Sequence, residues 1–106
     1  LIRGTVRKIG ITGLKKQMSM VEGFHKICEV GLAGNSALNA ANLHVIMSSI
    51  NCTYFEYWLP KEVHQWGVKE QLKINKNGNL DAPTGPGLGI DLDEEWITAH
   101  KVTTLS

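Results

Sequence analysis

The residues best suited to chemistry are one buried carboxylate candidate and one glycine-rich turn. Glu56 lies within the aromatic run Tyr54–Trp58, where an unpaired carboxylate would be costly to bury. Two roles stay open for it, an active-site carboxylate or a structural glutamate in a salt bridge. The turn 31–35 follows an expected strand and precedes an expected helix, where free backbone N–H groups bind anions. Gly31 and Asn35 are therefore the predicted ligand-binding positions.

Other polar clusters have plainer explanations. The acidic run 91–95 is typical of a first helical turn, where carboxylates interact favourably with the helix dipole. The loop 85–89 is rich in glycine, but it contains Pro86 and lacks the Lys and Ser/Thr of a phosphate-binding loop. None of the four histidines is expected at the C-terminal end of a strand: His25, His44, His64 and His100. We expect no metal site in this chain.

A strand–helix–strand unit must position the first two features. Within residues 28–60, the segment Cys28–Val30 has β character and stops at a glycine turn. Asn35 or Ser36 then caps a helix whose apolar residues recur at three and four positions. The aromatic, β-rich segment 53–59 predicts a second strand, which ends at a proline. Two strands that bracket a helix are most simply parallel, with a right-handed crossover.

The segment before this unit predicts one more strand and one more helix. Residues 1–6 are a short strand candidate, and residues 10–13 form a turn. Thr12 can cap a helix whose apolar stripe ends near Ile27. The predicted order is therefore β-α-β-α-β.

The C-terminal part breaks this alternation. Residues 61–67 predict a loop or a helical turn, and residues 72–82 predict a hairpin around Asn77-Gly78, a strong turn signal. Residues 83–89 are expected to form an irregular loop, and residues 91–97 a capped helical turn.

Length and composition indicate one domain. The chain has 106 residues, of which 42% are hydrophobic, enough for one core. The net charge of +1, mixed in sign along the chain, excludes an electrostatic footprint for nucleic acid or an acidic membrane. No apolar run has the length of a membrane span, and the first ten residues lack a signal-peptide core. Cys28 and Cys52 are interpreted as buried thiols in a reducing compartment, so we expect a cytoplasmic protein.

Five segments carry a resemblance to a known family. They are Lys8–Gly13, Gly34–His44, Tyr54–Glu56, Asn79–Pro83 and Pro86–Asp91. In this order and spacing they resemble the C-terminal portion of the mandelate racemase/muconate-lactonizing branch of the enolase superfamily. The resemblance covers nearly the whole chain.

The resemblance implies an α/β fold that is part of a larger barrel. Residues 1–60 would be the last three βα units of a modified (β/α) barrel, resembling strands 6–8. Residues 61–106 would add a C-terminal hairpin, the PGLGI loop and a tail of the same domain. Because a complete barrel needs about 250 residues, we expect this chain to be a fragment. The missing strands carry the family's magnesium carboxylates and lysine bases, so Mg²⁺ is implied only for a full-length member.

The family chemistry is carried over one position at a time. Members abstract a proton next to a substrate carboxylate and stabilise the enolate that forms. The family's sixth-strand aspartate falls on Thr5 when one glycine is gapped, or on Gly4 without a gap. The seventh-strand histidine falls on Gly31, so both halves of the acid/base pair are replaced. The eighth-strand carboxylate, which in racemase-like members donates a hydrogen bond to the substrate carboxylate, falls on Glu56.

Three functions follow as hypotheses. The first is a C-terminal piece of an acid-sugar dehydratase or racemase-like enzyme, a lyase or isomerase, inactive alone and acting on a small carboxylate only when complete. The second is a catalytically degenerate family member without the His-Asp dyad. The third is a non-catalytic α/β module that associates with itself or with the remainder of a barrel, because a short parallel sheet leaves open edges and apolar surface. No nucleic acid or membrane partner is expected.

Overall fold

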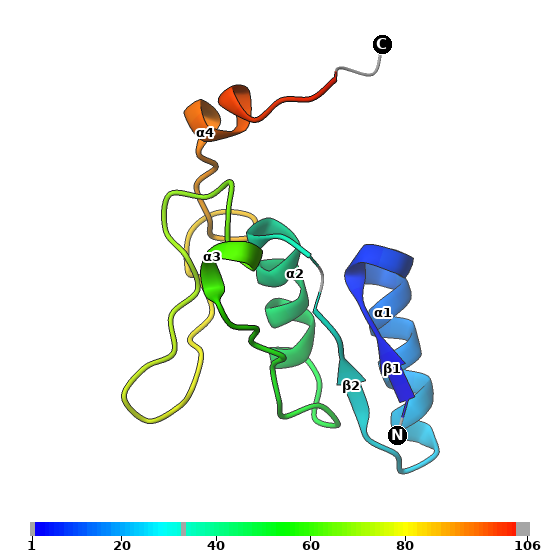
Figure 1. The fold of residues 1–106 in the computed structure, drawn as a ribbon. Helices are drawn as coiled ribbons and strands as arrows, with labels where there is room; N and C mark the ends of the chain where they lie inside the picture. The colour runs from blue at the N-terminus through cyan, green and yellow to red at the C-terminus, as the bar shows by residue number, and fades with distance from the viewer. Residues whose placement is uncertain (1, 33, 104–106) are drawn as a thin grey trace.

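The computed structural model describes residues 2–32 and 34–103. Two short strands and two long helices make up the first half of the chain, and two short helices lie in the second half (Figure 1). In chain order the elements are β1 (Ile2–Gly4), α1 (Val6–Gly23), β2 (Cys28–Val30), α2 (Ser36–Met47), α3 (Lys61–His64) and α4 (Glu94–Ala99).

The sheet is parallel, as predicted. β1 pairs with β2 in a register that places Ile2 beside Cys28 and Gly4 beside Val30. Val30 in turn forms a single parallel bridge with Phe55. The predicted strand 53–59 is wrong in extent, because its pairing stops at this bridge. One physical reason is visible in the structure: the next backbone donor along β2, at residue 32, bonds to a side chain of the returning segment and not to its backbone.

Helix α1 differs from the prediction at both ends. It begins at Val6, which shortens the expected strand 1–6 to β1, and Thr12 lies inside the helix instead of capping it; residue 1 lies outside the described residues. The break expected near residues 10–13 is confined to Gly10, whose φ of 69° and ψ of 173° interrupt the helical geometry. Glycine adopts such a φ at little steric cost. The helix ends at Gly23, before the predicted end at residue 27.

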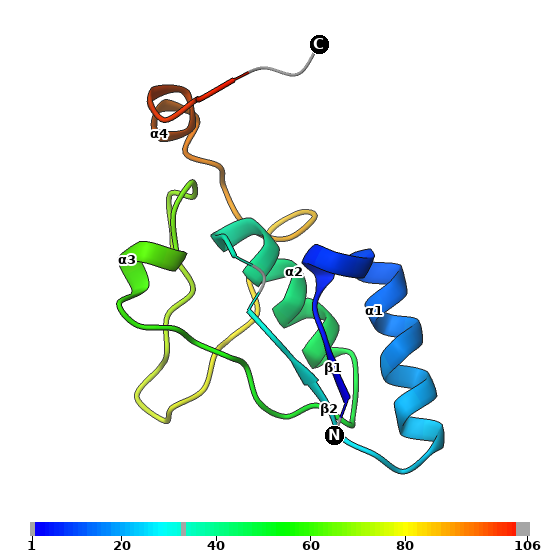
Figure 2. The ribbon, with the colours of Figure 1, turned by 45° about the vertical axis from the view of Figure 1, so that its right-hand side comes forward.

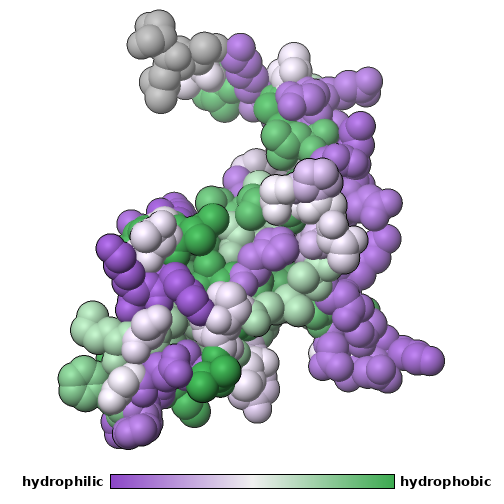
Figure 3. Space-filling model, turned by 180° about the vertical axis from the view of Figure 1, so that it is seen from behind, coloured by the Kyte–Doolittle hydropathy of each residue, from purple (hydrophilic) through white to green (hydrophobic). Residues whose placement is uncertain are grey.

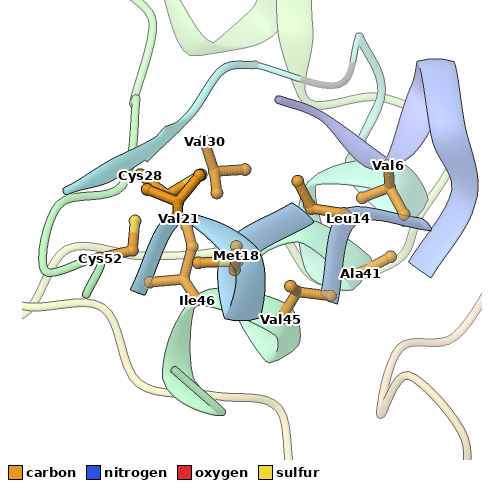
Figure 4. Packing of buried hydrophobic residues seen from close by; sticks show 10 residues of the cluster. All are labelled: Val6, Leu14, Met18, Val21, Cys28, Val30, Ala41, Val45, Ile46 and Cys52. Carbon is orange, nitrogen blue, oxygen red and sulfur yellow. The ribbon is translucent and has the colours of Figure 1, made fainter. Parts of the chain in front are cut away.

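The core lies between the helices and one face of the sheet (Figure 4). The Asn35 side chain caps α2 by accepting a hydrogen bond from Leu38 N at 2.9 Å, which confirms the predicted start of this helix. α1 packs against α2 and against both strands. The buried residues that point toward one another in Figure 4 are Val6, Leu14, Met18, Val21, Cys28, Val30, Ala41, Val45, Ile46 and Cys52. Both cysteines are buried free thiols, as predicted, and burial raises the pKa of each.

One buried polar residue ties this core to the strand ends. The Asn42 side chain, 1% exposed, accepts a hydrogen bond from Val6 N at 3.0 Å and donates one to Gly31 O at 2.8 Å. A buried amide without partners would be destabilising. Asn42 therefore fixes the start of α1 relative to the chain that leaves β2.

The C-terminal part agrees closely with the prediction. Most of it is loop around the short helices α3 and α4 (Figure 2). Ile74 and Leu80 form an antiparallel bridge around the turn at Gly78, which confirms the hairpin. α3 is the expected helical turn, and α4 is capped by Asp93, whose side chain accepts from Trp96 N at 2.9 Å. In the loop before α4, a Cβ at Gly89 would lie 2.7 Å from the Pro83 side chain, so packing explains this glycine.

A large apolar surface remains without a covering layer. Phe24, Ile50, Tyr54 and Leu59 are each more than 70% exposed, and green areas lie between polar ones on the face shown in Figure 3. The radius of gyration is 14.7 Å, above the roughly 13 Å of a compact domain of this length. This extended shape is what a piece of a larger barrel would show. None of the helices in the described part of the chain is long and apolar enough to cross a membrane.

Two methionines of α1 offer a matched test of this core. Met18 is 1% exposed and Met20 is 63% exposed. Met18→Ala is expected to lower the free energy of unfolding by about 2–5 kcal/mol, whereas Met20→Ala should change it by about 0.5 kcal/mol or less. Urea denaturation followed by circular dichroism measures both, and equal losses would contradict this placement of α1.

Candidate active site

A pocket of about 540 Å³ lies where the parallel strands end. Gly4 and Thr5 reach it from β1, Gly31 and Leu32 from β2, and Glu56 from the segment just after the Phe55 bridge. The carboxyl ends of parallel strands are the edge at which α/β barrels place their chemistry. The remaining lining residues are Arg3, Arg7, Lys8, Gly34, Trp58 and His64.

The positions that the family pattern assigned to chemistry therefore meet in one place. This pocket is lined by Thr5 or its ungapped alternative Gly4, by Gly31 and by Glu56, which come from three segments far apart in the sequence. A threonine hydroxyl and a glycine carry no group that exchanges a proton near neutral pH. The pocket thus brings these positions together, with Glu56 as the carboxylate among them.

Glu56 is held by donors from three segments, which are β1, the turn after β2 and its own segment, where the Trp58 side chain also donates to the carboxyl. Arg3 Nη2 donates to Oε1 at 2.5 Å in an ion pair, and Leu32 N donates to Oε2 at 2.5 Å. The hydrogen bond from the Arg3 guanidinium is the main cause that lowers the pKa of the Glu56 carboxyl, and partial burial acts in the opposite direction. Glu56 in turn raises the pKa of Arg3. The carboxyl is therefore ionised, whereas a hydrogen-bond donor role toward a substrate would need it protonated.

Arg3 reaches Glu56 across a glycine. A Cβ at Gly31 would lie 2.9 Å from Arg3 Nε, and one at Gly34 would lie 3.7 Å from Arg7 Nη1. Two guanidinium groups thus lie along the turn between β2 and α2. Sequence reasoning missed both arginines and Lys8. The available signal was a cationic residue in a predicted strand whose expected parallel neighbour ends in a glycine-rich turn.

The predicted ligand-binding positions have structural roles in this chain. The Gly31 N–H donates to Gly4 O at 2.9 Å and so belongs to the sheet, although Gly31 lines the pocket. Asn35 caps α2 and is not a lining residue of this pocket. Ligand binding by these two residues remains a prediction. The turn they flank does supply one amide toward an anion, that of Leu32, and the anion is Glu56.

Within residues 2–32 and 34–103, no group of three or more His, Cys, Asp or Glu side chains is placed to hold a metal ion. Glu56 is the one carboxylate among the lining residues of the pocket, and it is paired with a guanidinium. Mg²⁺ prefers several oxygen ligands, so the residues present here do not fit it. Of the histidines, His64 lines the pocket and contacts the Trp58 ring edge-on with centroids 4.7 Å apart, a placement that the sequence did not predict.

Comparison with known families places this site in context. Residues 2–96 match the model of the family described as Enolase C-terminal domain-like. The chain belongs to this family. The resemblance to the mandelate racemase/muconate-lactonizing branch of the enolase superfamily, stated from the sequence, is confirmed. No curated protein matches the chain significantly in sequence.

Two solved structures of similar proteins support the enolase-like fold. One is a proposed mandelate racemase/muconate lactonizing enzyme from Pseudovibrio sp., 34% identical, with a TM-score of 0.83 over 89% of this chain and 25% of that protein. The other is a proposed dehydratase from Mesorhizobium loti, 21% identical, with a TM-score of 0.80 over 92% of this chain and 26% of that protein. At that identity the second shows the fold alone. The chain spans about a quarter of the length of both.

The ion pair predicts how stability depends on pH. The folded-state pKa of Glu56 is below its ordinary value of 4.5. The stabilisation by the charged form is therefore complete above that ordinary value, and it is lost as the pH falls through the folded-state pKa. Glu56→Gln, which keeps the size of the side chain, is expected to melt below the wild type at pH 7, and the difference should shrink in acid.

Thermal melts of both proteins from pH 7 down to pH 3 measure this effect. Glu22→Gln is the matched control, since Glu22 is exposed on α1 and lies outside the pocket, and it should melt close to the wild type at pH 7. A Glu56→Gln deficit that stays constant across the pH range would rule out the ion pair as its cause.

Proposed function

We propose that this chain is the C-terminal part of the catalytic barrel of a mandelate racemase/muconate-lactonizing-like enzyme, of the acid-sugar dehydratase or racemase class, and that it is inactive alone. The three short parallel segments ending at the pocket would be strands 6–8 of that barrel. The observation that carries this proposal is the meeting of Thr5, Gly31 and Glu56 at one strand edge. The family membership and the 25% coverage of the Pseudovibrio protein support it.

The residues of this chain would bind and orient a substrate. Three cationic side chains line the pocket, from Arg3, Arg7 and Lys8, and they favour a carboxylate-bearing molecule. A cation near the reacting carbon also stabilises negative charge that develops on an adjacent oxygen. In place of the aspartate and histidine stand Thr5 and Gly31. The base that removes the proton would therefore come from a strand outside this chain.

Magnesium would be bound by residues from the rest of the barrel. Proteins of this family typically use Mg²⁺, which would stabilise the enolate oxygens in a complete enzyme. The pocket residues described here do not make its ligand set. The carboxylates that hold it would lie on the missing strands, and the chain's own contribution would be the cationic wall of the site.

A chimera tests the proposal directly. This chain would replace the equivalent quarter of the Pseudovibrio protein, and exchange of the proton next to the carboxylate would be followed by ¹H NMR in D₂O. The substrates would be sugar acids on which the intact Pseudovibrio protein is active. We expect no exchange by the chain alone and exchange by the chimera that chelation of Mg²⁺ abolishes. Exchange by the chain alone would contradict the proposed inactivity.

The same assay separates the two catalytic hypotheses. A chimera that folds, as judged by its melting transition, but shows no exchange would indicate that Thr5 and Gly31 make this family member catalytically degenerate. The intact Pseudovibrio protein is the control that the assay and the metal supply are adequate.

A second candidate function, self-association, is favoured by the exposed apolar surface. Side chains such as Ile50 and Tyr54, 82% and 81% exposed, would lie against neighbouring segments in a complete barrel. In the isolated chain, these side chains can be covered by a second copy of the chain. We expect light scattering on the size-exclusion eluate to show a dimer or larger assembly, and Ile50→Glu to shift it toward the monomer. A well-folded wild-type monomer would contradict this candidate.

A further inference from the structure

The Glu56 carboxylate is bound in the way that proteins bind a free carboxylate ligand. One oxygen accepts from the Arg3 guanidinium and the other from the Leu32 amide, each at 2.5 Å. Charge-assisted bonds of this kind, from a guanidinium and from a backbone amide at a helix approach, are strong and specific for oxyanions. The donors come from β1 and from the turn after β2, so their backbone is positioned by the sheet.

The position of Arg3 is built into the fold. The space that a side chain at Gly31 would occupy is filled by the guanidinium, since a Cβ there would lie 2.9 Å from Nε. Gly31 itself is fixed by Gly4 on one side and by the buried Asn42 on the other. The Leu32 amide is therefore positioned by interactions that do not involve Glu56, whereas the Arg3 guanidinium lies over Gly31 and is paired with Glu56.

The surroundings hold more positive charge than Glu56 neutralises. Arg7 and Lys8 also line the pocket, and Glu56 is the one carboxylate among its lining residues, so two positive charges are in excess. Thr5 also lines it and is 8% exposed, and its hydroxyl oxygen is buried without a hydrogen-bond partner. The occupant is accessible, because the Glu56 and Arg3 side chains are 27% and 54% exposed. The pocket thus has positive charge in excess for an external anion, while the Thr5 hydroxyl is enclosed beside it.

We propose that the Arg3 guanidinium and the Leu32 amide form a receptor for the carboxylate of a small external acid, which Glu56 occupies as an internal counter-ion. This inference rests on the proposed function for the identity of that acid as substrate. It assigns carboxylate binding to two groups outside the family motif. A ligand carboxylate enters as Glu56 turns away, and the excess charge on Arg7 and Lys8 compensates the displaced glutamate and favours a diacid over a monoacid.

Rescue by a small anion tests the receptor on the 106-residue chain. Glu56→Ala removes the internal occupant, and formate, a carboxylate without a side chain, is the probe. A ligand that binds only the folded state stabilises it. Formate is therefore expected to raise the melting temperature of Glu56→Ala saturably, and by more than an equal concentration of chloride does. Formate should bind Glu56→Ala about tenfold or more tightly than it binds the wild type. The Leu32 amide resonance in ¹⁵N NMR should shift with the same saturation.

Two variants control for nonspecific salt effects. Glu22→Ala removes an exposed carboxylate of α1 outside the pocket, and formate should stabilise it no more than it stabilises the wild type. Arg3→Met combined with Glu56→Ala should lose the formate response. If Glu56→Ala does not fold alone, formate-dependent and chloride-independent folding is the readout. A response to formate no larger than to chloride in both measurements would overturn the receptor.

This outcome is separable from that of the exchange assay. Absence of formate binding would remove the receptor and leave the chimera experiment to decide the proposed function. Formate binding by a chain whose folded chimera shows no exchange would keep the receptor as an anion site in a non-catalytic protein.

Discussion

The structure depends most on the parallel register of three short segments. Because β1, β2 and Phe55 run in the same direction and in register, everything that follows each of them arrives at one edge. There the chain must turn back toward the helices, and backbone amides are left without sheet partners. One of these amides, at Leu32, finds Glu56 instead. A single set of pairings thus builds the pocket and also truncates the third strand.

The buried amide of Asn42 extends this constraint into the helical layer. Its two hydrogen bonds join the first residue of α1 to the residue after β2. Without it, two buried backbone groups would lose their partners, which is costly in a core of apolar side chains. The helical layer and the sheet edge are therefore coupled through one residue. Outside this coupled core, several large apolar side chains stay exposed, among them Phe24, Ile50 and Leu59.

Local signals made most of the elements predictable. The Asn35 cap, the Asn77-Gly78 turn and the acidic turn before α4 each act within a few residues, and the sequence predicted all three. The start of α1 was predicted wrongly because Gly10 was interpreted as the first residue of a turn, whereas it interrupts a helix that already began at Val6. The extent of the third strand depends on the contact between Glu56 and Leu32, 24 residues apart, which no local pattern encodes.

The site was predictable only where a family pattern supplied positions. Glu56, Gly31 and Thr5 lie at one strand edge, where the family pattern set them, and their catalytic and binding roles remain predictions. The aromatic context of Glu56 left its partner undetermined. Arg3 precedes it by 53 residues, and only the parallel register brings the two together. Arg7, Lys8 and His64 reach the pocket from segments that sequence reasoning treated as helix surface or loop. Long-range pairing was the missing information in each case.

Gly31 and Arg3 must be considered as one unit. A Cβ at residue 31 would lie 2.9 Å from Arg3 Nε, so a larger side chain there requires the flexible Arg3 side chain to move from its observed position beside Glu56. An arginine stays charged throughout the physiological range and so cannot take up a proton as a histidine does. It can bind a carboxylate and stabilise negative charge on oxygen. A fixed cation on this wall therefore favours anion binding, and in the proposed enzyme proton transfer would fall to a residue from another strand.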